Sequence, residues 1–173
     1  MCSAEAMCDI EADPESEIFV ATVDVENCFY QMLMPEALSE YFALPAVLAK
    51  EVGVSSIGTT AVSRDEMIYP CFSVLPMGFS WSLYLAQNAN ESLAGDAGLL
   101  ADATLIADRG APLVLGPGKL GYYVYVDNVG VVGTSAEAVD KALDEVEESL
   151  RKAGLSTHER TWATSSAEAL GMV

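Results

Sequence analysis

Two acidic residues occupy positions where neighbouring strands could hold a carboxylate in place. Asp24 ends the apolar stretch 18–25, and Asp127 lies inside the apolar run 122–132. Aromatic and β-branched residues flank Asp127, so the run predicts two short strands joined by a tight Asp127-Asn128 turn. If both strands belong to one sheet, the two carboxylates converge at one edge. Such hard oxygen ligands suit Mg²⁺, and two ions about 4 Å apart can activate a hydroxyl and stabilise a departing pyrophosphate.

Either aspartate alone has a simpler interpretation, because turns and strand ends favour Asp. A third segment, residues 75–82 (Leu-Pro-Met-Gly-Phe-Ser-Trp-Ser), strengthens the chemical interpretation because it enters a predicted helix through a Pro-Gly turn. Gly78 has no side chain, so the backbone there can approach a base pair closely. Taken alone, the segment is equally consistent with an ordinary helix start that carries aromatic core residues.

The elements that must position these residues alternate along the chain. We predict a strand at 18–25, a helix at 36–42 after Pro35, a strand at 67–74, a helix at 80–93, the hairpin at 122–132, a helix at 135–153 and a final strand at 169–173. Residues 29–34 are expected to be extended, 50–65 to form a loop or hairpin connection, and 97–107 to be helical. This order favours an α+β fold, a polymerase-palm-like antiparallel sheet with helices packed on one face.

The helix at 135–153 carries the clearest signals. Thr134 and Glu137 are expected to form a capping box at its start. Gly154 follows as a stop signal. The apolar face of the helix consists of Val139, Leu143, Val146 and Leu150.

Composition sets limits on the partners. The 173 residues suit one domain or a large part of one, and 51% are apolar, enough to form a core. No apolar stretch approaches the roughly 20 residues that span a bilayer. No membrane partner and no secretion signal are therefore expected, and the four cysteines are expected to be free thiols of an intracellular protein of the cytoplasm or nucleus.

The charge balance argues against simple nucleic-acid binding. Eight Lys and Arg residues face 26 Asp and Glu residues, giving a formal net charge of −18. Proteins that bind nucleic acids usually gain affinity by neutralising phosphates with basic side chains. Residues 1–17 contain no basic residue and are expected to form an acidic, flexible N-terminal segment before a folded part at 18–173.

Taken together, three segments resemble the palm of a reverse transcriptase from a retrotransposon. Residues 24–30 resemble the family's first motif, an aspartate followed five residues later by an aromatic residue. Residues 75–82 resemble the second motif, Leu-Pro-x-Gly followed by an aromatic and small polar residues. Residues 125–128 resemble the third, Tyr-x-Asp-Asp. The resemblance covers most of 18–173 in the expected order.

The resemblance implies RNA-directed or DNA-directed DNA synthesis from dNTPs on a template-primer of RNA or DNA. Asp24 and Asp127 would be catalytic and would hold Mg²⁺ (or Mn²⁺) together with Asn128. Nucleotide-binding positions implied by the resemblance are Val25, whose carbonyl would be an extra metal ligand, Phe29, under the sugar, and Met77 and Gly78, beside the templating pair. Simple core packing is an equally good interpretation of Phe29.

Three features depart from the family pattern. Asn128 replaces the usual second aspartate, and an amide binds Mg²⁺ more weakly than a carboxylate. Met77 replaces a frequent glutamine. The family's lysine after the long helix is not evident, and neither Lys152 nor Arg160 can be assigned to its role. His158 is interpreted as a surface residue in a polar tail.

Three hypotheses follow. The leading one is a partial palm at 18–173, with fingers and thumb largely absent, that is weak or inactive as an isolated chain; fingers, thumb or RNase H segments would then be encoded nearby. The second is a catalytically silent retroelement remnant that acts, if at all, through protein contacts. A nucleotide cyclase is the weakest hypothesis, because residues 126–128 lack the Gly-Gly-rich acidic hairpin typical of that group.

Overall fold

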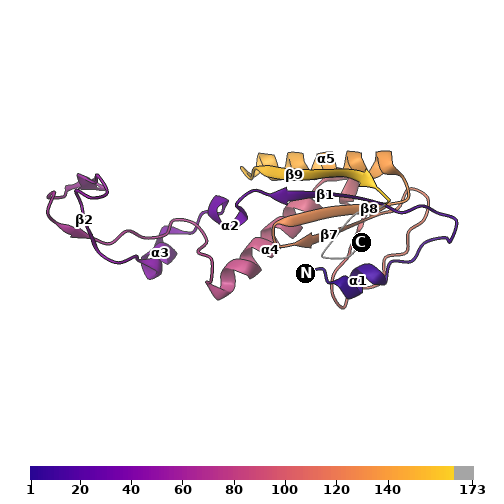
Figure 1. The fold of residues 1–173 in the computed structure, drawn as a ribbon, viewed down its shortest axis with the longest axis horizontal. Coiled ribbons are helices and arrows are strands. Elements are labelled where there is room, and N and C mark those ends of the chain that lie inside the picture. The colour runs from indigo at the N-terminus through magenta and orange to yellow at the C-terminus, as the bar shows by residue number, and fades with distance from the viewer. Residues whose placement is uncertain (166–173) are drawn as a thin grey trace.

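A five-stranded sheet forms the centre of the computed structural model, which describes residues 1–165. Its strand order is β6-β7-β8-β1-β9, and Figure 1 labels β7, β8, β1 and β9. The strands are β1 (Phe19–Val25), β6 (Thr104–Leu105), β7 (Leu120–Tyr125), β8 (Asn128–Gly133) and β9 (Thr157–Thr164). All neighbours pair antiparallel except β6 and β7, which are parallel. The predicted α+β fold is therefore confirmed, and the predicted strand at 169–173 lies outside the described residues.

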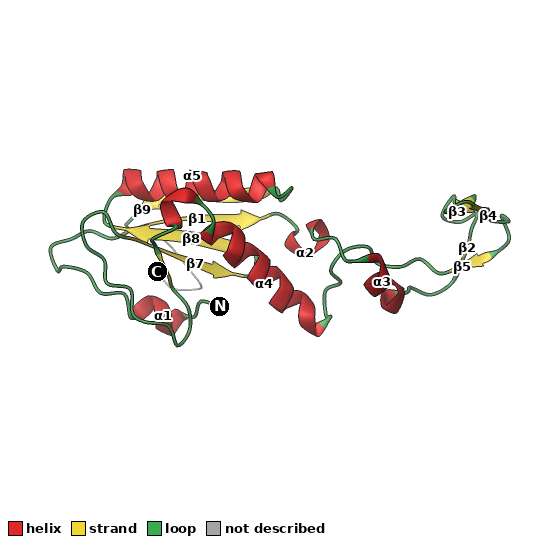
Figure 2. Ribbon diagram, turned by 180° about the vertical axis from the view of Figure 1, so that it is seen from behind, coloured by secondary structure: helices red, strands yellow, loops and turns green. Residues whose placement is uncertain are grey.

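Two long helices pack on the same face of this sheet (Figure 2). They are α4 (Ser80–Gly95) and α5 (Ala136–Lys152). The predicted apolar stripe of α5, from Val139 to Leu150, is completely buried against Val23, Val129 and Val131 of the central strands. Burial of such side chains, at about 25 cal/mol per Å² of apolar surface, is the main term that holds α5 on the sheet.

The N-cap of α5 is not the residue that the sequence predicted. Ser135, not Thr134, is the N-cap, because its backbone is extended and its side chain accepts a hydrogen bond from the Ala138 amide. The position of the cap thus differs by one residue from the predicted capping box. Gly154 adopts a φ of +87°, a left-handed conformation that favours glycine. The predicted stop is therefore confirmed.

The opposite face of the sheet is covered by the N-terminal segment and the loop before β7. The segment contains α1 (Ala4–Cys8), and Cys2 is buried in a second cluster with Leu113, Leu115 and Tyr123. The Glu11 amide donates to the Leu113 carbonyl at 2.8 Å, and the Leu115 amide donates to the Glu11 carbonyl at 2.8 Å. The acidic segment that was expected to be flexible is thus packed against the sheet in this structure.

Residues 33–79, here called the arm, leave the sheet after β1 and return at the start of α4 (Figure 1). The arm contains α3 (Glu36–Ser39), a 3₁₀ turn η1 (Glu40–Phe42), β2 (Val47–Leu48), β3 (Ser56–Ile57), β4 (Thr60–Ala61) and β5 (Met67–Ile68). The hairpin connection predicted within 50–65 is present as the pair β3 and β4. Beyond Ile68 the predicted strand is reduced to two isolated bridges, since Pro70 cannot donate to a ladder.

Two other local predictions were wrong. Residues 28–31 form a short helix, α2 (Cys28–Gln31), because Asn27 adopts a φ of 45° and turns the chain at the end of β1. Residues 97–107 contain only the 3₁₀ turn η2 (Gly98–Leu100) and then β6. The backbone of β6 pairs with β7 and is therefore extended instead of helical. Just after β6, the Ile106 amide donates to the Tyr122 carbonyl at 2.7 Å.

No helix within residues 1–165 is long and apolar enough to cross a bilayer.

Candidate active site

The two aspartates lie at the same end of neighbouring central strands. Asp24 is paired with Asn128 in the antiparallel β1–β8 ladder. The Val25 amide then donates to the Asp127 carbonyl at 2.8 Å. Because Val23 and Val25 are buried against the helices, the alternation of a strand directs Asp24 to the opposite face of the sheet. The sequence-based expectation that these strands are neighbours therefore agrees with the structure.

The charge of Asp127 is affected by its surroundings. Burial raises the pKa of its carboxyl above the ordinary value, and the neighbouring Asp24 charge raises it further. The carboxylate also accepts a hydrogen bond from its own backbone amide, which lowers the pKa, as does the nearby His158. A carboxylate whose pKa is raised by burial and by a neighbouring negative charge gains from a nearby cation. The electrostatics therefore favour a site for positive charge.

The turn that carries Asp127 is strained. Tyr125 pairs with Asn128, so the two turn residues are Val126 and Asp127 rather than the predicted Asp127-Asn128. Val126 has a φ of 58°, an unfavourable conformation for a β-branched residue. The φ is positive at Val126 and not at Asp127, which is the pattern of a type II′ turn, and such turns usually have glycine at the first position. Such strain persists only where surrounding contacts determine the conformation.

Two buried amides of α4 provide those contacts. Gln87 accepts a hydrogen bond from the Val126 amide at 2.7 Å and donates to the Val124 carbonyl at 2.9 Å. Asn90 donates to the Val126 carbonyl at 2.7 Å. Both side chains are almost completely buried, so these bonds are formed away from water, where leaving them unmade is costly. Helix α4 thus fixes the backbone of the Asp127 turn.

Gln87 and Asn90 were not among the site residues expected from the sequence. The available signal was their spacing of three residues, which places both amides on one face of the predicted helix. Ala86 and Ala94, which are also buried in α4, contribute to the same inward face. Polar amides on an inward helix face require partners, and here the partners include backbone groups of Val124 and Val126 that only the folded chain brings close.

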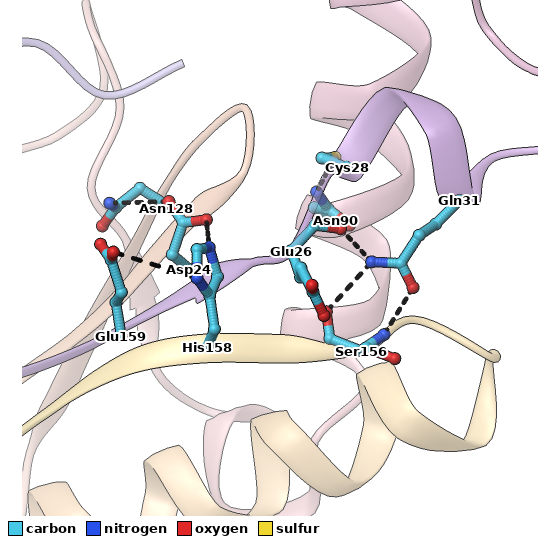
Figure 3. Close-up of polar contacts among 9 residues, drawn as sticks. All are labelled: Asp24, Glu26, Cys28, Gln31, Asn90, Asn128, Ser156, His158 and Glu159. Atoms are coloured by element: carbon cyan, nitrogen blue, oxygen red, sulfur yellow. Dashed lines mark hydrogen bonds and ion pairs between the residues drawn. The ribbon is translucent and has the colours of Figure 1, made fainter.

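Asp24 has two side-chain partners (Figure 3). The Nε2 atom of His158 lies 2.8 Å from its Oδ1, and the Asn128 amide nitrogen lies 3.4 Å from its Oδ2. His158 is exposed, as expected of a surface residue, but the polar segment that carries it is not a tail: it forms β9, in which His158 is paired with Asp24 across the β1–β9 ladder. The Asp24 side chain is 23% exposed and that of His158 is 43% exposed.

The remaining predicted residues lie around this end of β1. Val25 is completely buried and Phe29, on α2, packs partly buried against the main core. Met77 is 67% exposed and accepts a hydrogen bond from the Tyr30 hydroxyl through its sulfur, at 3.6 Å. Gly78 has a φ of +92° with open space around it, so its backbone conformation, not crowding, requires glycine.

The oxygen ligands available at this site are of the types that a hard divalent cation binds. Asp24 and Asp127 offer carboxylate oxygens, Asn128 an amide and Val25 a main-chain carbonyl, the ligand types that Mg²⁺ accepts. Among residues 1–165 no group of three or more His, Cys, Asp or Glu side chains is gathered closely enough to hold a metal ion. The site is therefore suited to a cation whose other ligands come from water and from substrate phosphates.

These features define the class: an α+β palm-like sheet with two carboxylates at the ends of adjacent central strands. A scan against protein-family models matches residues 3–172 to the family described as Reverse transcriptase (RNA-dependent DNA polymerase). The chain belongs to the reverse transcriptase family, which confirms the family resemblance found in its motifs; the retrotransposon origin stays a prediction. A search of the curated proteins gave no significant match.

Proposed function

We propose that this chain is the palm of an RNA-directed DNA polymerase, in which Asp24 and Asp127 bind divalent cations for nucleotidyl transfer from a dNTP to a primer 3′-hydroxyl. The observation that carries the proposal is the placement of the two residues at one end of adjacent strands, tied by the Val25–Asp127 backbone hydrogen bond. Membership of the family supports the activity in general terms.

In this proposal each residue has a distinct task. Bound Mg²⁺ or Mn²⁺ supplies activation of the attacking hydroxyl and stabilisation of the leaving pyrophosphate. Asp24 and Asp127 hold the cations, and Asn128 and the Val25 carbonyl add neutral oxygen ligands. Phe29, on the helix that follows β1, supports the sugar of the incoming nucleotide. Met77 and Gly78, at the entrance to α4, contact the nucleotide and its templating partner.

The acidic balance limits what the chain does alone. With 26 acidic and eight basic residues it repels a phosphate backbone over most of its surface. We therefore propose that residues 18–173 act as a palm whose template-primer is held by basic fingers and thumb segments outside this sequence. In isolation the chain binds template-primer weakly, because each missing phosphate contact lowers the affinity.

Primer extension tests the proposal. The purified chain is assayed with an RNA template, a DNA primer, dNTPs and Mn²⁺ at about 0.15 M salt, where repulsion between exposed charges is screened beyond about 8 Å. We expect slow addition of a few nucleotides that is abolished in Asp24→Asn and Asp127→Asn and kept in a control at the exposed Asp102, Asp102→Asn. Extension that persists in Asp24→Asn would contradict the assignment of the site, and rapid synthesis of long products would contradict the proposed weakness.

A silent remnant remains the second candidate function, and Asn128 is the observation that favours it. An amide at this position removes one negative charge beside Asp24 and donates toward that carboxylate instead of binding a cation. If wild type shows no extension above the Asp24→Asn background while Asn128→Asp does, the chain has lost its activity through this one position. If both fail, the remnant hypothesis is supported.

A further inference from the structure

The contact between His158 and Asp24 occupies a carboxylate that the proposed function requires. Both oxygens of Asp24 are engaged, Oδ1 by His158 at 2.8 Å and Oδ2 by Asn128 at 3.4 Å. Each carboxylate oxygen has two lone pairs, and His158 and Asn128 each face one, so a cation that binds Asp24 competes with these partners for access to the carboxylate. The shorter contact is the one with His158, and a carboxylate acceptor makes such a hydrogen bond stronger than one between neutral groups.

The backbone around His158 is fixed close to the site (Figure 3). The Glu26 amide donates to the Ser156 carbonyl at 3.0 Å, and the Ser156 amide donates to the Gln31 side chain at 2.7 Å. The Gln31 amide nitrogen in turn donates to the carbonyls of Glu26 and Ser156. These bonds tie the start of β9 to the end of β1 and α2, so His158 is held opposite Asp24 by the main chain.

The side chain of His158, by contrast, is held by weaker contacts: besides Asp24 it faces Glu159, whose Oε1 lies 4.0 Å from its Nδ1 (Figure 3). It lies on β9, an edge strand of the sheet that the structure describes, and is 43% exposed. Rotation about its side-chain torsions would move the ring into water without opening the core, because exposed side chains change rotamer readily. The next residue, Glu159, has a φ of 50°. The register of the β1–β9 pairing also shifts between Thr22 and Asp24, so this part of the ladder is distorted.

We propose that His158 is an internal competitor of the cation: by donating Nε2–H to Oδ1 of Asp24 it closes the metal site, and cation binding requires that the ring swing outward. The inference rests on the proposed function, since it takes Asp24 as a metal ligand. A positioning role for His158, in which the ring orients Asp24 for the cation, makes the opposite prediction. Removal of a competitor strengthens cation binding, whereas removal of a positioning residue weakens it.

Mn²⁺ binding to the full chain, followed by calorimetry and by the loss of the free-ion paramagnetic signal at one fixed pH, separates the two roles. We expect His158→Ala and His158→Phe to lower the dissociation constant for Mn²⁺ about fivefold, the size expected for releasing one partly exposed hydrogen bond to a charged group. Thr161→Ala, at an exposed position of the same strand, is the matched control and should bind as wild type does. Unchanged or weaker binding in either His158 variant overturns the proposal.

The Asp24→Asn variant distinguishes failure of the proposed function from failure of the inference about His158. If this variant binds Mn²⁺ as wild type does, Asp24 is not a ligand and the proposed function fails together with the inference. If it loses binding while the His158 variants do not gain any, only the inference fails. Thermal unfolding of each variant confirms that it is folded before binding is compared.

A second measurement follows the ring directly. His158 is the single histidine of the sequence, so the tag-free protein gives one set of imidazole signals in ¹H–¹⁵N spectra. Saturating Mg²⁺ should shift these signals, with a midpoint equal to the dissociation constant measured for the same protein. Imidazole signals that stay in place while Mg²⁺ saturates the site would overturn the proposal.

Discussion

The amide of Val25 donates a hydrogen bond to the carbonyl of Asp127 at 2.8 Å. The residue after the first carboxylate is thereby bound to the residue that carries the second, although about a hundred positions separate them in the sequence. The geometry of the site is thus set by main-chain bonds between strands and by the two amides of α4 that hold the turn.

Gln87→Ala should be among the most destabilising single substitutions in α4. It leaves the Val126 amide and the Val124 carbonyl without their side-chain partner in a buried environment. Each unsatisfied buried group costs about 1–3 kcal/mol, so we expect the free energy of unfolding to fall by about 2–4 kcal/mol in urea denaturation. Asn88→Ala, at the exposed neighbouring position, is the control. Equal effects of the two substitutions would contradict the assigned role of Gln87.

Asp127→Asn should stabilise the fold at neutral pH while abolishing cation binding. Burial and the Asp24 charge raise the pKa of Asp127 in the folded protein. The folded state therefore binds this proton more tightly than the unfolded chain, and stability is lost as the pH rises from the ordinary Asp pKa of about 3.9 through the raised value. We expect a gain of less than about 1 kcal/mol at neutral pH, because partial exposure screens the charge.

The pH dependence gives this prediction its control. The difference in unfolding free energy between Asp127→Asn and wild type should shrink toward zero at about pH 3, where the wild-type carboxyl is protonated in both states. Thermal melts across this range measure it. A variant that is less stable than wild type at pH 7 would show that the carboxylate stabilises the fold instead of straining it.

Gly78→Ala should destabilise the entrance to α4 although no atom blocks the added methyl group. The space around Gly78 is open, but its φ of +92° lies where L-residues are strained. We expect a loss of about 1–2 kcal/mol in denaturant unfolding. Gly116→Ala is a matched control, since its surroundings are equally open and its φ lies outside that region. If both variants lost the same amount of unfolding free energy, backbone strain at Gly78 would not explain the loss.

The sequence predicted the elements whose patterns are local. The apolar stripe of α5, the Pro-Gly turn before α4 and the β-branched hairpin each depend on spacing within one segment, and all three are present. The strand β9 was missed because Thr157–Thr164 is an edge strand with no apolar alternation. Backbone groups make its pairing with β1, and residue type predicts such backbone pairing only weakly.

The same limit applies to the site. Asp24 and Asp127 were identifiable because each ends or interrupts an apolar run, and their motifs match a family. Gln87, Asn90 and His158 act on groups far away in the sequence, and no spacing rule relates them to those groups. Their contacts depend on the packing of α4 and β9 against the central strands.

The most direct test of the account is a double-mutant cycle on cation binding. Mn²⁺ titrations of wild type, Asp24→Asn, Asp127→Asn and the double variant are compared, with Asp102→Asn as an exposed control. If both carboxylates hold the same cations, each single substitution abolishes tight binding and the double variant loses no more than either one, a strongly non-additive result. Independent, additive losses, or wild-type affinity in either single variant, would show that the two residues do not form one metal site.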